Sequence, residues 1–365
     1  MKRREFVTAL GAATATLAGC SRQATPPSGA AAPGQTFSWK MVTTWPANFP
    51  ALGTGATYLA RAIEAASGGR IRVKVYGAGE LVPAFEVFDA VSAGIAELGH
   101  GAAYYWKGKA EAASFFSAVP FGLNALEMNA WLYFGGGLEL WKEVYAPFGL
   151  VPRPAGNSGV QMGGWFKREI RSMADLAGLK MRIPGLGGEV LARAGGNPQT
   201  TPGSEIFTAM QTGVIDATEW VGPYNDLAFG LHKVAKYYYY PGWQEPGSTL
   251  ECIVNQRAFE ALPEDLRKIV LLACQATNDR MLAEFTARNH EALATLVNEH
   301  AVELRAFPPD VLARLKSIWR EVAAETAARD PMFARVLASC DAFMTGSSNW
   351  MKISEEAYLA TRDLG

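Results

Sequence analysis

Hydrophobic and polar positions alternate along the chain with a period that changes from segment to segment. Ile71, Val73 and Val75 are separated by single polar residues, which is typical of a strand with one polar face. The stretch 55–66 has apolar residues at helical spacing and ends at Ser67-Gly68-Gly69, which favours a left-handed helix stop. Strands and helices of this kind follow one another, and their order predicts an α/β sheet with short connections.

The same reading extends through the rest of the chain. Strands are predicted at 160–166, 179–183, 214–220 and 249–255, with helices at 186–194 and 204–211. After Pro263 one long helical pattern continues to about Ala301. Pro309 and Pro331 then stand where two more helices are expected to begin.

Length and composition narrow the class of protein. The 365 residues predict two domains, and 49% apolar against 19% charged residues allow a sizeable core. The 34 Lys and Arg balance 35 Asp and Glu. This balance argues against a nucleic-acid-binding protein, which needs a basic surface. A charged ligand would therefore be recognised by a local site.

Residues 1–36 are predicted to be an export signal and a flexible leader. Arg3 and Arg4 precede a short apolar stretch, as in a twin-arginine signal, with a general secretory signal as the alternative. The sequence Leu17-Ala18-Gly19-Cys20 resembles a lipoprotein cleavage site, in which Cys20 would carry the lipid, although a chance cysteine is an equal alternative. Either signal predicts a periplasmic protein.

Three further cysteines, Cys252, Cys274 and Cys340, make an odd number, which is no disulfide framework. Three buried thiols are expected at least as readily as one bridge. No later stretch has 18 or more consecutive apolar residues, so no transmembrane helix is expected after the signal.

Arg182 is the first candidate for ligand binding. It ends a predicted strand just before Pro184, Gly185 and the start of a helix. Ligands of open α/β sheets bind at the carboxyl ends of strands, helix N-termini favour anions, and a guanidinium matches a carboxylate. The alternative is a surface Arg on the polar face of the strand.

Glu219 and Trp220 end another predicted strand, and Glu245 lies in a loop rich in Gly and Pro. Two carboxylates near Arg182 would repel an anionic ligand unless a cation bridged them. Oxygen ligands of this kind suit a hard ion such as Na⁺ or Ca²⁺. The alternative is a pair of solvated Glu side chains.

Two other polar side chains are candidates for the same cleft. Gln161 can donate and accept hydrogen bonds, and Tyr104 can offer a hydroxyl over an apolar wall. A surface amide and a core tyrosine are the alternatives. The run Tyr237 to Tyr240 is expected to be a strand without chemistry of its own.

The chain resembles the periplasmic solute-binding subunits of TRAP (tripartite ATP-independent periplasmic) transporters. The resemblance covers roughly 37–330, and its most specific stretches are 176–182 and 209–216, in this order and spacing. The stretches 86–94 and 262–266 also match but are weak alone. The resemblance implies a two-lobed, type II-like periplasmic binding protein with hinge strands, a long interlobe helix and C-terminal helices.

The predicted division of the chain follows from this fold. Residues 37–160 with about 251–300 are expected to form lobe I, and 161–250 to form lobe II with the strands that contact the ligand. The segment 301–365 is expected to form C-terminal helices. Its apolar face includes Phe333, Cys340 and Trp350, which predicts a homodimer through the C-terminal helix or, as the alternative, packing on its own lobes.

The resemblance also implies residue roles. The family's substrate arginine corresponds to Arg182. In the branch that binds 2-oxo and 2-hydroxy monocarboxylates, a Glu-Trp pair and a later Glu bind a cation, which corresponds to Glu219, Trp220 and Glu245. Positions Ala103, Tyr104 and Gln161 match that branch too. The chain therefore resembles most closely the binding proteins for α-keto acids such as pyruvate with Na⁺.

The predicted function is extracytoplasmic binding of a 2-oxo monocarboxylate with a cation, for delivery to TRAP membrane subunits, without catalysis. A binding subunit for lactate or another 2-hydroxy acid with Ca²⁺ is the alternative. An exported enzyme acting on carboxylates is more distant, because Gly-x-Ser-x-Gly, His-Glu-x-x-His and P-loop motifs are lacking. A ligand-sensing ectodomain would normally carry a transmembrane helix and a signalling module.

Overall fold

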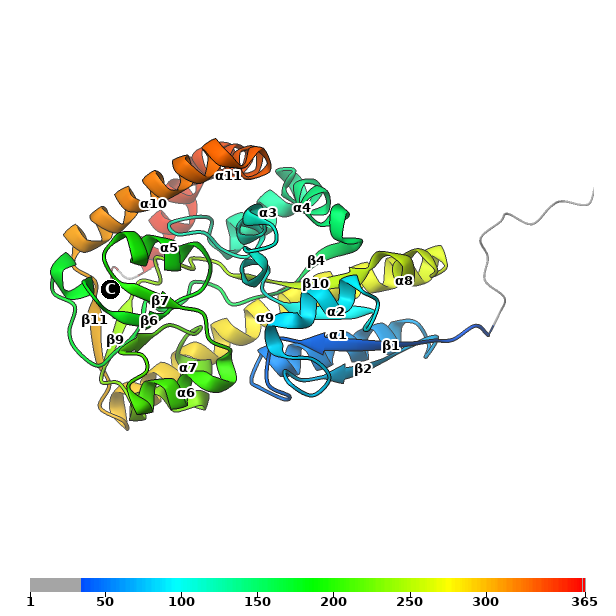
Figure 1. The fold of residues 1–365 in the computed structure, drawn as a ribbon, viewed down its shortest axis with the longest axis horizontal. Helices are drawn as coiled ribbons and strands as arrows, with labels where there is room; N and C mark the ends of the chain where they lie inside the picture. Colours follow the sequence, from blue (N-terminus) through cyan, green and yellow to red (C-terminus); the bar gives the residue numbers. More distant parts are fainter. Residues whose placement is uncertain (1–33, 363, 365) are drawn as a thin grey trace, which may run out of the picture.

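The computed structural model describes residues 34–362 and 364, which fold around two β-sheets that lie side by side (Figure 1). The predicted signal and Cys20 lie outside these residues, and only residues 34–36 of the predicted leader lie within them. The first sheet has the strand order β2 (Ile71–Tyr76), β1 (Phe37–Thr43), β3 (Leu98–Gly101), β10 (Thr249–Asn255) and β4 (Leu150–Asn157). The second has the order β11 (Glu303–Ala306), β9 (Tyr237–Tyr240), β5 (Gly164–Phe166), β8 (Ala217–Thr218), β6 (Lys180–Arg182) and β7 (Asn197–Gln199).

We call the first sheet with the helices packed on it lobe I, and the second sheet with its helices lobe II. In lobe I, β2, β1 and β3 are parallel, and β10 runs antiparallel to both β3 and β4. The α/β class predicted from the sequence is confirmed. Parallel strands leave their carboxyl ends at one edge, so residues that follow β1 and β3 meet there.

The helices cover both sheets. Those before the long helix are α1 (Leu52–Ala66), α2 (Val87–Ser92), α3 (Ala125–Phe134), α4 (Gly137–Tyr145), α5 (Gly185–Arg193), α6 (Gly203–Thr212), α7 (Pro223–Phe229) and α8 (Gln256–Glu260). Short 3-10 turns include η2 (Ala103–Trp106) and η5 (Met173–Leu176). Ser172 and Asp175 form a capping box at the start of η5.

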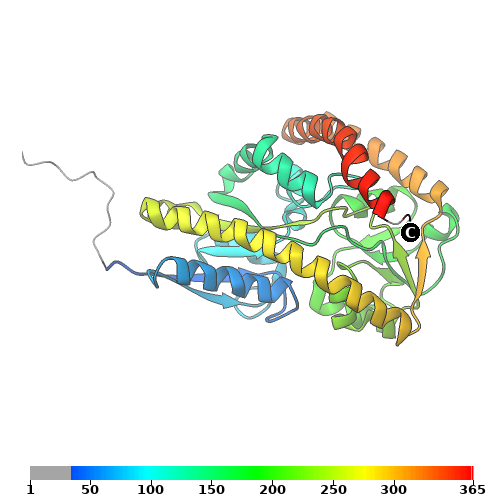
Figure 2. The same ribbon diagram turned by 180° about the vertical axis from the view of Figure 1, so that it is seen from behind.

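The long helix α9 (Glu264–Asn298) runs beneath both lobes (Figure 2). Its first half, including Leu266 and Val270, packs into the apolar core of lobe I. Its second half, including Phe285 and Leu296, packs into a second apolar cluster, which combines residues of lobe II with residues of lobe I where the lobes meet. The predicted interlobe helix is therefore confirmed, and its two apolar halves explain why one helix can serve two cores.

Two segments of chain pass between the sheets above this helix. One joins β4 to β5 and the other joins β9 to β10. They are hydrogen bonded to each other, because the amide of Gln161 donates to the carbonyl of Glu245 at 3.1 Å and the amide of Gly242 donates to the carbonyl of Gln161 at 3.0 Å. Gly242 needs its missing side chain here, since a Cβ would lie 2.2 Å from the carbonyl oxygen of Gln161.

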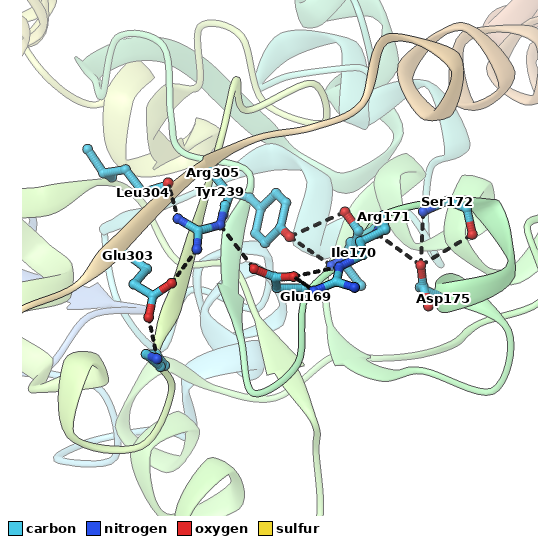
Figure 3. A network of polar contacts seen from close by, with 10 residues as sticks. Glu169, Ile170, Arg171, Ser172, Asp175, Tyr239, Glu303, Leu304 and Arg305 are labelled. Carbon is cyan, nitrogen blue, oxygen red and sulfur yellow. Dashed lines mark hydrogen bonds and ion pairs between the residues drawn. The ribbon is translucent and has the colours of Figure 1, made fainter.

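The C-terminal region differs from the prediction in one respect. Residues 301–365 were expected to be helical, but they also contain β11, which pairs in parallel with β9. Two ion pairs fasten β11 to its surroundings, Arg305 with Glu169 and Glu303 with Lys236, and Arg305 also pairs with Glu303 within the strand (Figure 3). In the neighbouring strand β9, Tyr239 donates its hydroxyl to the carbonyl of Ile170. Glu303-Leu-Arg-Ala306 has no strand signature of its own, so pairing with β9 makes this strand.

The remaining helices are α10 (Pro309–Arg329), α11 (Pro331–Met351) and α12 (Ala357–Arg362), and they cross the face of both lobes (Figure 1). Phe333, Val336 and Cys340 of α11 are buried within this chain. Trp350 and Ile353 are 64% and 72% exposed. One part of the apolar face of this segment thus packs on the rest of the chain, and the other part is exposed.

The thiols of Cys252, Cys274 and Cys340 are buried and free of disulfides. No helix within the described residues is long and apolar enough to cross a membrane.

Candidate functional site

Arg182 ends β6 and is completely buried between the lobes. Its Nε donates to the carbonyl of Thr201 at 3.2 Å, Nη2 donates to the hydroxyl of Tyr105 at 3.2 Å, and Nη1 is ion-paired with Glu219. The predicted alternative of a surface arginine is wrong. Burial would lower the pKa of Arg182, but the charge of Glu219 holds it above its ordinary value.

Glu219 and Trp220 follow β8, which is shorter than the predicted strand and ends at Thr218. The neighbouring strand fixes them, because the amide of Glu219 donates to the carbonyl of Arg182 at 3.1 Å. The guanidinium carbon of Arg182 lies 5.1 Å from the centre of the Trp220 ring, a distance typical of a cation–π contact. Both side chains are buried, so Arg182, Glu219 and Trp220 form one cluster.

Gln161 and Glu245 lie on the two crossing segments. The sequence placed Gln161 on a strand, but β5 begins only at Gly164. Gln161 donates from Nε2 to the hydroxyl of Ser158 at 3.1 Å, whereas its buried Oε1 has no hydrogen-bond donor in the described part of the chain. Glu245 is 3% exposed and accepts from Ser248. The alternative of two solvated glutamates is therefore wrong as well.

The two carboxyl groups are adjacent and share one electrostatic environment. Burial raises the pKa of Glu245 to about 7, against hydrogen bonds with Ser248, Tyr104 and Glu219 that lower it. Burial also raises the pKa of Glu219 well above its ordinary value, and the charge of Glu245 adds to this despite Arg182. A buried carboxyl pair of this kind favours sharing a positive charge, either a proton or a cation.

These residues fit a hard cation. When both carboxylates are ionised, Oε2 of Glu219 has no hydrogen-bond donor among the described residues, and neither has Oε1 of Gln161. Carboxylate, amide and backbone oxygens are the ligands that Na⁺, Ca²⁺ and similar ions prefer. No group of three or more His, Cys, Asp or Glu in the described residues is arranged to hold a metal ion, so any site here depends on neutral oxygens as well.

Lobe I contributes the turn η2, which follows β3. Tyr104 is 6% exposed, and its pKa is raised well above the ordinary value by burial and by the charges of Glu245 and Glu219, which places it at the cluster. Ala103 lies in the same turn and is fully buried. Its side chain is a methyl group, so it can offer a ligand only apolar contact.

Two residues at this cluster were missed by the sequence analysis. Tyr105 accepts a hydrogen bond from Arg182 across the lobes. Trp45, which follows β1, packs edge-on against Trp220 with ring centres 6.1 Å apart. Its Nε1 donates to Nδ1 of His100 at 2.8 Å, which fixes the indole in place. The position of Trp45 after a parallel strand was the only available signal.

The histidines take no part in the cluster. His100 is buried between Trp45 and the carbonyl of Ala155, and burial lowers its pKa to about 4, so it is neutral. His232 and His300 stack on each other in lobe II with ring centres 4.1 Å apart. The site offers a guanidinium, two carboxyl groups, an amide and aromatic rings, which can bind an anion and a cation together.

Two sheets joined by crossing segments, with a buried guanidinium between the lobes, define the class of two-lobed solute-binding proteins. The chain belongs to family 7 of the bacterial extracellular solute-binding proteins, the DctP family, whose model matches residues 41–330.

Three known proteins are especially similar. A monocarboxylate 2-oxoacid-binding periplasmic protein of Nostoc sp. is 44% identical over 360 residues, or 98% of each chain. A TRAP solute-binding protein from Pseudoalteromonas atlantica, solved with sodium and pyruvate, is 42% identical with a TM-score of 0.87 over 89% of this chain and 99% of its own. One from Colwellia psychrerythraea, solved with calcium and pyruvate, is 43% identical with a TM-score of 0.88 over 90% and 100%.

Proposed function

We propose that this protein captures a 2-oxo monocarboxylate together with a cation outside the cytoplasm and delivers it to the membrane subunits of a TRAP transporter. The observation that carries the proposal is the buried Glu219, which is paired with Arg182 through one oxygen while the other lacks a donor in the described chain. The similar proteins with pyruvate and sodium or calcium support the ligand class.

Each residue has a role in this proposal. Arg182 binds the ligand carboxylate, for which a guanidinium is suited in shape and charge. Glu219, Glu245, the carbonyl of Trp220 and the amide oxygen of Gln161 hold the cation, and the hydroxyl of Tyr104 with the methyl group of Ala103 faces the ligand from lobe I. When bound, the cation supplies positive charge to the carboxylate and keto oxygens of the ligand.

A charge count distinguishes the two ions. Arg182 contributes one positive charge, whereas Glu219, Glu245 and the ligand contribute three negative charges when all are ionised. A divalent ion balances this count, and Na⁺ leaves one negative charge unless Glu245 keeps its proton. Without a cation, burial raises the pKa of Glu245 to about 7, and a bound cation would lower it because a positive charge favours the ionised carboxylate. Na⁺ is our first choice because the resemblance favours it, with Ca²⁺ and a 2-hydroxy acid such as lactate as the alternative.

Transport needs the lobes to open and close, and no bond is made or broken. The structure has the lobes in contact through Arg182 and Tyr105, and through the Asn225 amide, which donates to the carbonyl of Pro50 at 3.0 Å. A ligand between the lobes stabilises this arrangement by its differential affinity for it.

Export and assembly complete the proposal. We assign the N-terminal signal to the twin-arginine type, with lipidation at Cys20 as a variant of it. The exposed Trp350, Ile353 and Tyr358 at the end of the chain favour a homodimer through the C-terminal helices. Light scattering on the mature protein tests the dimer, and a monomer at all concentrations would disprove it.

Calorimetry on dialysed protein tests the function. We expect pyruvate to bind only when Na⁺ or Ca²⁺ is present. Arg182→Ala should weaken binding by at least about 100-fold, because truncating one partner of a buried, hydrogen-bonded charge pair in a binding site costs about 2–5 kcal/mol of affinity. Arg193→Ala, which removes an exposed arginine of α5, is the matched control. Undiminished binding by Arg182→Ala, or binding that ignores the cation, would overturn the proposal.

A further inference from the structure

Asp226 lies in the first turn of α7 and is 1% exposed. Its Oδ2 accepts hydrogen bonds from Nε1 of Trp165 at 2.9 Å and from the hydroxyl of Tyr238 at 2.6 Å. Its Oδ1 accepts from the backbone amide of Val221 at 3.3 Å. The carboxylate therefore has donors on both oxygens inside lobe II, and one of these donors belongs to the turn that carries Trp220.

The hydrogen bond from Val221 fixes the direction of a carbonyl oxygen. The amide of Val221 and the carbonyl of Trp220 belong to one peptide group, which is planar and trans, so its N–H and C=O bonds point in opposite directions. Because Asp226 holds the N–H, the oxygen of Trp220 points away from Asp226. This oxygen is the backbone ligand that the proposed function assigns to the cation.

The other two donors to Asp226 come from the sheet of lobe II. Trp165 on β5 and Tyr238 on β9 are partners in the antiparallel ladder, and their rings stack with centres 4.0 Å apart. Trp165 is also the partner of Thr218, the last residue of β8. Asp226 thus connects the centre of the sheet to the turn that follows β8.

The carboxylate also contributes negative charge to the site. Burial raises the pKa of Asp226 to about 6, against the hydrogen bonds that it accepts, so the group is ionised at pH 8. Burial is the main cause of the raised pKa of Glu219, and the charges of Glu245 and Asp226 add to it. An amide that donates to an ionised acceptor is polarised, which increases the negative charge on the carbonyl oxygen of the same peptide group.

We propose that Asp226 is a positioning residue for the cation site, because it holds the peptide group between Trp220 and Val221 with the carbonyl oxygen directed at the cation. This rests on the proposed function, which assigns that oxygen to the cation. Asp226 acts on the organic anion only through the cation. Replacing a group that orients the ligands of a metal ion typically weakens metal binding about 10- to 100-fold.

An amide cannot replace this carboxylate. In Asp226→Asn one oxygen becomes an NH₂ group, which is a donor, whereas the neighbouring groups need acceptors. If the NH₂ group takes the place of Oδ1, it faces the amide of Val221, and if it takes the place of Oδ2, it faces Nε1 of Trp165. We therefore expect Asp226→Asn to weaken cation binding by about 10- to 100-fold.

Glu251→Gln is the matched control. Glu251 is also completely buried and accepts from the same two kinds of donor, Nε1 of Trp106 and the hydroxyl of Tyr145. It lies on β10 of lobe I, and neither of these donors belongs to the turn after β8. We expect Glu251→Gln to leave the cation affinity within about threefold of the wild type.

Calorimetry at pH 8 tests the proposal. The pyruvate affinity is measured over a series of Ca²⁺ concentrations and over a parallel series of Na⁺ concentrations. The midpoint of a series gives the cation affinity, and its plateau gives the pyruvate affinity of the cation-loaded protein. For Asp226→Asn we expect the midpoint to move to about 10- to 100-fold higher cation concentration, with a plateau within about threefold of the wild type.

A second variant keeps the test decisive if Asp226→Asn does not fold. Tyr238→Phe removes one of the two donors to Oδ2 and keeps the ring that stacks on Trp165. A lost hydrogen bond to a charged group loosens the carboxylate, so we expect the midpoint to rise by at least about threefold with an unchanged plateau.

The outcomes separate the two proposals. If the wild type does not bind pyruvate with either cation, the proposed function itself fails. If the wild type binds but Asp226→Asn and Tyr238→Phe keep its midpoint, or Glu251→Gln loses as much as Asp226→Asn, then Asp226 does not position the cation site. If the plateau of Asp226→Asn falls as far as its midpoint rises, Asp226 shapes the cleft as a whole and its assignment to the cation is wrong.

Discussion

Two glutamates with the same burial, one in each lobe, have opposite surroundings. Glu251 on β10 and Glu219 after β8 are both completely buried. Each oxygen of Glu251 has its own donor, because Trp106 donates from Nε1 to Oε1 and the Tyr145 hydroxyl donates to Oε2 at 2.8 Å. Glu219 is paired with Arg182 through one oxygen, and within the described residues the other oxygen is without a donor.

The difference shows how to tell a structural carboxyl group from a functional one. A buried polar group is tolerated when its hydrogen bonds are complete, and Glu251 meets this condition inside lobe I. Glu219 does not, and a second carboxyl group lies beside it. Burial alone would have marked both residues, whereas the incomplete hydrogen bonding marks only Glu219 as a place for a ligand or an ion.

The largest expected effect comes from removing the charge at each glutamate. Glu219→Gln should weaken binding of the cation and the 2-oxo acid by at least about 30-fold, because a neutral amide cannot balance the cation, and a lost buried charge pair is worth several kcal/mol. Glu251→Gln should change both affinities by less than about threefold. Calorimetry on the two variants measures this. Equal losses in both would show that the distinction between the two glutamates is wrong.

A smaller effect concerns stability and pH. Burial raises the pKa of Glu251 to about 7 although Trp106 and Tyr145 act to lower it. The unfolded chain releases this proton near its ordinary pKa, while the folded protein keeps it until about 7. The contribution of Glu251 to the free energy of unfolding is therefore fully present below its ordinary pKa. It is lost as the pH rises through the folded-state pKa of about 7.

Glu251→Gln should flatten that part of the pH dependence by up to about 3 kcal/mol between about pH 5 and about pH 8, since an amide mimics the protonated acid. Urea unfolding at the two pH values measures the difference between variant and wild type. Burial also raises the pKa of Glu245 to about 7. The free energy of unfolding of the wild-type protein therefore falls with rising pH by more than the contribution of Glu251 alone. Parallel curves for wild type and variant would mean that Glu251 is ionised in the folded protein.

The sequence was sufficient for the elements that have strong local patterns. The alternation of Ile71, Val73 and Val75 predicted β2, and the pattern after Pro263 predicted α9 within a few residues. Arg182 was placed at a strand end by the turn that follows it. These features depend on neighbouring residues, and neighbouring residues are what a single sequence displays.

Contacts between distant segments could not be predicted from the sequence. Tyr105 and Trp45 reach the cluster only because β1 and β3 are parallel and end at the same edge, and because the lobes meet. Gln161 was predicted on a strand because Val160 to Phe166 reads as one, but its first residues cross between the sheets and bond to Glu245 instead. β11 was missed because its pairing with β9, rather than its composition, makes it a strand.

The smallest effect is expected at an ion pair that differs from Arg182–Glu219 in exposure. Lys107 and Glu189 also pair across the lobes, but their side chains are 24% and 37% exposed. Exposed pairs contribute about 0.2–1 kcal/mol and are screened by salt. Lys107→Gln should therefore speed ligand release by no more than about fivefold, and the difference should shrink at high salt, as stopped-flow measurements would show.

Lys142→Gln, which removes a pair within α4, is the control and should leave the rate unchanged. A change beyond about tenfold that persists at high salt would mean that Lys107 contacts the ligand itself, since a solvent-screened pair between the lobes cannot produce it.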